Sequence, residues 1–163
     1  MSSRVLRAFI NQIDVGNLQE ESGLWGFQYA SSWLEHPQRY PLSPHLPLTA
    51  GRVVDGASLR RVQWYFDNLL PEEGQRLLLA SDARIEAADA FGLLAWYGAE
   101  SAGSLTLLPP EAPPPLATPL RPLPDAALEA RIRLLPKAPL TRGAIKRMSL
   151  AGAQHKLAVV MQH

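Results

Sequence analysis

The sequence contains no cysteine, which excludes disulfide bonds and thiolate chemistry and fits a reducing compartment. It also lacks any apolar run near the ~18 residues of a membrane span, and its N-terminus has no signal-peptide apolar core. Neither sign of charge dominates, because 16 basic residues face 15 acidic ones. That balance gives no electrostatic support for direct binding to DNA or to a membrane. These absences predict a cytoplasmic globular protein.

Residues that bind metals or catalyse reactions are sparse. His36 and His45 lie nine residues apart with no third ligand at metal spacing, so we predict no metal site. Asp67–Asn68 could form a metal pair and Glu72–Glu73 an acid/base pair, but a structural role is the favoured interpretation of both. No Gly-x-Ser-x-Gly elbow is present. We therefore predict no catalytic residue in this chain and no activity from it alone.

Residues 1–108 are patterned as a small α+β unit. Alternating side chains between residues 4 and 29 predict a β meander, with turn residues at Asn11–Gln12 and Asp14–Asn17. Four prolines between residues 37 and 47 then force an extended, irregular segment, because proline fixes φ and donates no hydrogen bond. Trp33, Trp64 and Tyr65 are predicted to be core aromatics rather than binding residues.

Two helices and a strand are predicted to complete this unit. Pro71 suits the first turn of one helix, in which Leu77–Leu79 would face the core. Asp89 is the expected N-cap of a second helix, which Gly98 would terminate. Leu105–Leu108 has the composition of a strand.

The composition changes sharply at residue 109. Eight of the sixteen residues from 109 to 124 are proline, which predicts a stiff, polyproline-like linker; an SH3-type ligand is the less favoured alternative. Beyond it, Leu128, Ile132 and Leu135 recur at helical spacing, and Pro136 would end the short amphipathic helix.

Ser149–Lys156 is the most informative segment of the sequence. Small residues around Gly152 leave backbone N–H groups open to an anion, a hydroxyl begins the segment and a lysine ends it. The apolar Leu157–Val160 follows as an expected strand. Glycine-bearing, lysine-terminated loops beside strands hold nucleotide phosphates in many proteins. Taken alone, the pattern also fits an ordinary loop that leads into a strand.

This segment, in company with three others, resembles the HipA toxin kinases. Ser149–Lys156 is similar to that family's SxAGAQxK glycine-rich loop. Upstream, residues 41–48 resemble its PLS-x-x-LPL segment, residues 66–72 its FDNLLPE segment, and residues 89–105 its D-x-F-x-LL…G…AGAL stretch. Four segments in the family's order exceed what chance would produce.

The resemblance implies a serine/threonine kinase of a type II toxin–antitoxin system. Such a kinase would use ATP and Mg, phosphorylate an aminoacyl-tRNA synthetase, inhibit translation and promote growth arrest, under control of a HipB-like DNA-binding antitoxin. It implies that Ser149 is autophosphorylated and that the loop covers the ATP phosphates. The phosphate-binding residues would be Ala151, Gly152, Ala153, Gln154, His155 and Lys156. His155 departs from the acidic residue or proline that many members carry, so no role that needs a carboxylate is assigned there.

Two interpretations of the whole chain remain open. In the first, residues 1–108 form the HipA N-terminal subdomain, 109–124 the linker and 125–163 the incomplete beginning of a kinase N-lobe. No HRD-like or DFG-like segment follows, so this chain would be the N-terminal part of a longer kinase. In the second, it is a stand-alone, antitoxin-like subunit of a split system that binds and inhibits a separate kinase chain. Neither interpretation requires ATP or Mg on this chain alone.

Overall fold

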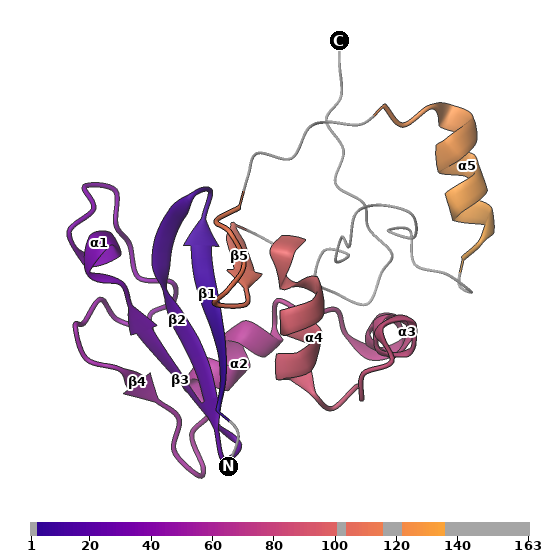
Figure 1. Ribbon diagram of the computed structural model, residues 1–163. Helices are drawn as coiled ribbons and strands as arrows, with labels where there is room; N and C mark the ends of the chain where they lie inside the picture. Colours follow the sequence, from indigo (N-terminus) through magenta and orange to yellow (C-terminus); the bar gives the residue numbers. More distant parts are fainter. Residues whose placement is uncertain (1–2, 101–103, 116–121, 136–163) are drawn as a thin grey trace.

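One antiparallel sheet of five strands organises the residues that the computed structural model describes, which are 3–100, 104–115 and 122–135. The strands lie side by side in the order β4-β3-β2-β1-β5 (Figure 1). Their bounds are β1 Arg4–Ile10, β2 Ile13–Glu21, β3 Leu24–Tyr29, β4 Val53–Val54 and β5 Leu105–Leu108. The mixture of this sheet with helices confirms the predicted α+β class.

The predicted meander is formed by β1, β2 and β3. Ser22 and Gly23 join β2 to β3, and both have a positive φ, as a two-residue hairpin loop of matching twist requires. The prediction of a turn at Asp14–Asn17 was wrong, because these residues lie within β2. The register passes from Ala8 opposite Gly16 to Phe9 opposite Asp14. The turn-forming residues therefore accommodate a bulge inside the strand.

In the part of the chain that the structure describes, five α-helices and one 3-10 helix accompany the sheet. Their bounds are α1 Ser31–Leu34, α2 Arg61–Asp67, α3 Glu73–Ala83, α4 Ala90–Tyr97, η1 Gly98–Glu100 and α5 Asp125–Arg133. Among them, α2 packs on β3, and α4 packs on β5 and α3. Edge-to-face and tilted aromatic pairs join helix to sheet, with ring centroids 5.1 Å apart for Trp25 and Phe91 and 5.3 Å apart for Phe27 and Phe66. The hydrophobic core thus lies between the sheet and these helices.

Helix α4 forms as predicted. The Asp89 side chain accepts a hydrogen bond from the backbone N–H of Gly92 at 3.0 Å and caps the helix, and Gly98 ends it. Asp89 also accepts from the Arg4 guanidinium at 2.8 and 2.9 Å, while Arg4 donates to Glu20 at 2.7 Å. The N-cap therefore ties α4 to the first two strands.

Helix α3 differs from its prediction in two respects. It begins at Glu73 rather than Pro71, because Leu70 and Pro71 are buried and Glu72 is extended, with ψ of 166°. Leu79 faces the core, whereas the Leu77 side chain is 62% exposed. Successive residues of a helix are rotated by about 100°, so three in a row cannot share one face.

The described part of the proline-rich segment, residues 109–115 and 122–124, contains neither helix nor strand. Helix α5 follows it as predicted, and none of its nine residues is buried. In Figure 1, α5 lies apart from the sheet. The division into subdomain, linker and kinase N-lobe stays a prediction.

Candidate functional site

The predicted phosphate loop, Ser149–Lys156, lies outside the residues that the structure describes. The two upstream segments at residues 41–48 and 66–72 are described, and the first of them contributes His45 to an open pocket. The pocket is built from the loop at 41–48, the residues before α2 and the first turn of α2.

Tyr29 fixes the proline-rich segment at residues 41–48. Its hydroxyl donates to the carbonyl oxygen of Leu46 at 2.6 Å and accepts from the backbone N–H of Leu42 at 2.9 Å. Burial raises the pKa of Tyr29, against the opposing effect of the Leu42 N–H. Leu46 is fully buried, and the next residue back, His45, is exposed. The segment therefore holds His45 at the surface on a fixed backbone.

Asp55 fixes the beginning of α2. This carboxylate is 4% exposed and accepts from the backbone N–H groups of Val62 and Gln63, at 2.8 and 2.9 Å. Arg60, at the N-cap position, makes no capping hydrogen bond of its own. Asp55 thus satisfies two helix donors from outside the helix, in the manner of an N-cap. Sequence reasoning missed it, because a capping residue normally directly precedes its helix.

Asp67, the first acidic residue of the 66–72 segment, has a structural partner. Asp67 forms an ion pair with Arg76 at 2.9 Å, and Arg76 also donates to the carbonyl oxygen of Ala87 at 2.8 Å. Asn68 donates its side-chain amide to the carbonyl oxygen of Trp64 at 2.7 Å. These contacts support the structural interpretation of Asp67–Asn68, since they connect α2 to α3 and to the chain after it.

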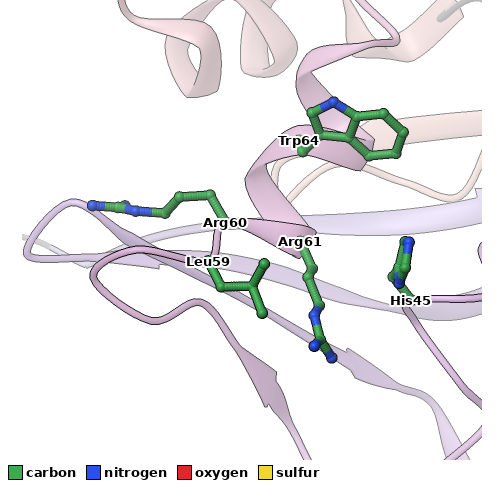
Figure 2. Close-up of a pocket in the computed structure, with 5 residues that line it drawn as sticks. All are labelled: His45, Leu59, Arg60, Arg61 and Trp64. Atoms are coloured by element: carbon green, nitrogen blue, oxygen red, sulfur yellow. The ribbon is translucent and has the colours of Figure 1, made fainter.

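The pocket has a volume of about 380 Å³ and is lined by His45, Leu59, Arg60, Arg61 and Trp64 (Figure 2). Arg60 is directed away from Trp64 and donates to the carbonyl oxygen of Gly23 at 2.5 Å. Arg61 extends from the start of α2 and has no hydrogen-bonding or ionic partner among residues 3–100, 104–115 and 122–135. One guanidinium is therefore held by the protein and the other is available to a ligand.

The prediction that Trp64 is a core residue was wrong, because its side chain is 62% exposed. Val62 and Phe66, one helical turn apart, occupy the buried face of α2, and Tyr65 is half-buried beside them. Trp64 falls on the opposite face. The helical spacing of Val62 and Phe66 is the signal that could have revealed this. Trp33 is buried at 2% exposure, as predicted.

The described residues hold no group of three His, Cys, Asp or Glu side chains close enough to bind a metal ion. Within the same ranges, no helix has the length and apolar character needed to cross a membrane. The pocket's side chains combine positive charge, an imidazole and two apolar surfaces.

A family profile described as "HipA N-terminal domain" matches residues 6–108. This chain belongs to the HipA family. The matched region contains the whole sheet from Leu6 onward, helices α1 to α4 and the pocket. Family membership thus rests on the part of the chain that carries the core.

Two relatives extend the comparison. The chain is 38% identical over 168 residues to "Putative kinase Y4mE" of Sinorhizobium fredii strain NGR234, an alignment that covers 99% of this chain and 39% of that protein. The fold of this chain matches a chain in the structure of the toxin–antitoxin complex of HipA, HipB and operator DNA from Shewanella oneidensis MR-1. That match has a TM-score of 0.62 and 25% identity, and covers 78% of this chain and 29% of the other. The chain therefore spans well under half the length of either relative.

Proposed function

We propose that this chain is the N-terminal part of a HipA-type serine/threonine kinase that acts in the cytoplasm as the toxin of a toxin–antitoxin system. The observation that carries the proposal is the alignment with the kinase homologue Y4mE, which includes 99% of this chain. The similarity therefore continues past the family profile, which ends at residue 108, into the segment that contains Ser149–Lys156.

The residues proposed to hold the ATP phosphates form the glycine-rich segment from Ala151 to Lys156. Its composition supports this role, because Gly152 between two alanines lets backbone N–H groups approach an anion closely. Lys156 adds a positive charge at the end of the segment. Mg would accompany ATP in the complete kinase, and its ligands would come from sequence beyond this chain.

Ser149 is the proposed regulatory residue. A phosphate on its hydroxyl would add nearly two negative charges next to the site for the ATP phosphates. Like charges repel, so the phosphorylated form would bind nucleotide poorly and the kinase would be switched off. Autophosphorylation at Ser149 would thus limit the activity of the toxin.

A HipB-like antitoxin is the proposed partner, and an aminoacyl-tRNA synthetase the proposed substrate. The first is supported by the Shewanella complex, in which a chain of similar fold occurs together with HipB and operator DNA. The second follows from the family resemblance of the four sequence segments. The chain's near-neutral charge favours a protein partner over direct contact with DNA.

The intact mass of the native product in its own cells, with a peptide map across Ser149, is the first test. We expect a product of more than twice the 17.9 kDa of this chain, with phosphate on Ser149. In the purified product, Lys156→Ala should abolish ATP-dependent phosphorylation. Ser149→Asp should weaken nucleotide binding, whereas Ser149→Ala should preserve it.

Two outcomes would contradict the proposal. A stable native product of 17.9 kDa that binds a separate kinase chain stoichiometrically would instead establish an antitoxin-like subunit of a split system. Normal nucleotide binding by the Ser149→Asp variant of a complete kinase would remove the regulatory role of Ser149.

A further inference from the structure

The stretch that builds the pocket has an unusual charge pattern. Residues 36–66 contain four arginines and a single acidic residue, Asp55. The Asp55 carboxylate is buried, accepts hydrogen bonds from two backbone N–H groups of α2, and does not line the pocket. Arg60 and Arg61 line the pocket and none of its lining residues is acidic, so its wall carries positive charge, although the chain as a whole is almost neutral.

The same wall exposes two large apolar side chains. Leu59 is 55% exposed and Trp64 is 62% exposed, and both line the pocket. Tryptophan and arginine are both among the residue types enriched at the energetic centres of protein interfaces. Asp55 and Tyr29 hold the backbone on either side, so a partner would not need to order this surface on binding.

We propose that this pocket binds an acidic segment of a partner protein that also carries a large apolar side chain. Carboxylates of the segment pair with the Arg61 guanidinium, beside the His45 imidazole. The apolar side chain packs on Trp64 and Leu59. Arg60 remains on the Gly23 carbonyl and shapes the wall. None of the lining residues belongs to the proposed phosphate loop, and the proposed binding does not depend on kinase activity.

The geometry favours a protein segment over other ligands. Nucleic acid binding draws its affinity from several phosphate contacts, whereas this wall offers one arginine without a partner among the described residues and two apolar surfaces. A small molecule is normally enclosed over most of its surface, but the two apolar walls here are more than half exposed. An extended peptide can lie across such an open surface and still cover both side chains.

Fluorescence anisotropy of the intact chain with a labelled peptide tests the proposal. The probe is a fluorescein-labelled peptide with one central phenylalanine flanked by three glutamates on each side. We expect saturable binding that weakens with salt. Arg61→Ala and Trp64→Ala should each weaken it by ~10-fold or more, as interface anchors do.

Matched variants exclude general effects of charge or exposure. Arg133→Ala removes an exposed arginine on α5, and Leu77→Ala removes a leucine on α3 whose side chain is as exposed as Trp64. Both should bind the peptide with unchanged affinity. A peptide with serine in place of phenylalanine, and one with lysines in place of glutamates, should bind at least ~10-fold more weakly.

Three results would overturn the proposal. The first is no binding of the acidic peptide up to about 1 mM, the weak limit of specific recognition. The second is equal binding of the lysine peptide or equal binding by the Arg61→Ala variant. The third is concentration-dependent dimerisation, measured by analytical ultracentrifugation and lost in Trp64→Ala, without peptide binding; the occupant would then be a second copy of this chain.

Discussion

Helices α4 and α5 are similar in length but differ in how many of their side chains are buried. Helix α4 has no charged residue and buries five of its eight side chains against the sheet and α3. Helix α5 has four charged residues among nine and buries none. A helix of this length is marginal by itself in water. Tertiary burial stabilises α4, and α5 must depend on other contributions.

Local electrostatic interactions stabilise α5 in part, in place of the side-chain burial that stabilises α4. Asp125 lies in its first turn, and Arg131 and Arg133 lie in its last, so all three favour the helix dipole. Glu129 and Arg133 also form an ion pair one turn apart. Such contributions are each a few tenths of a kcal/mol. One buried residue of α4 should therefore matter more to stability than most of α5.

Phe91→Ala should cause the largest decrease in the free energy of unfolding. Phe91 is 2% exposed, packs edge-to-face on Trp25 and lies under the Arg4 guanidinium at 4.9 Å. Removing the ring should lower the free energy of unfolding by ~3–5 kcal/mol, from lost burial and the cavity left behind. Urea unfolding followed by tryptophan fluorescence measures it. A loss below ~1 kcal/mol would show that α4 does not depend on tertiary burial in this way.

Asp55→Ala should follow, lowering the free energy of unfolding by ~2 kcal/mol, because the buried N–H of Val62 and the half-buried N–H of Gln63 would lose their acceptor. Asp55→Asn keeps one acceptor oxygen and is the matched control, with a smaller loss expected. The same urea titration checks both variants. Equal losses in the two variants would argue against the capping role and in favour of a need for negative charge.

Alkaline pH should lower the free energy of unfolding, because the folded protein raises the pKa of two tyrosines. Burial, together with the nearby Tyr29 and Tyr40, raises the pKa of Tyr65 to about 12, and burial and Asp82 also raise the pKa of Tyr97. The unfolded chain loses these protons near pH 10. Stability is therefore full below pH 10 and falls as the pH rises from 10 to 12.

Tyr65→Phe should reduce this fall by no more than ~1.4 kcal/mol per pH unit, the limit for one proton. Urea midpoints measured at about pH 8, 10 and 11 provide the check. An identical slope in Tyr65→Phe and the parent would contradict the assignment.

Ile132→Ala on α5 should have the smallest effect. Ile132 is 52% exposed and lies on a helix with no buried residue. The unfolding free energy of the chain should change by less than ~0.5 kcal/mol, the usual range for such surface positions. The urea midpoint of this variant, set beside that of Phe91→Ala, measures the contrast between the helices. A loss above ~1 kcal/mol would show that α5 has a packing partner.

Features whose signals are local could be predicted from the sequence. Alternation predicted the meander, Asp89 and Gly98 predicted both ends of α4, and the leucine run at residues 105–108 predicted the last strand. The family segments were also readable from order and spacing alone. Local rules suffice here because each signal acts within a few residues.

Only the tertiary structure decided which side chains remain at the surface around the pocket. Whether Trp64 is buried depends on how α2 lies against β3, and that orientation depends on Asp55, which precedes the helix by six residues and caps it from across a loop. Likewise, the register across β1 and β2 turned the residues expected to form a turn into a bulge. Long-range contacts decide which face of a helix or strand is buried where the local pattern does not. Here they leave the Trp64 indole and the Arg61 guanidinium exposed on the pocket wall.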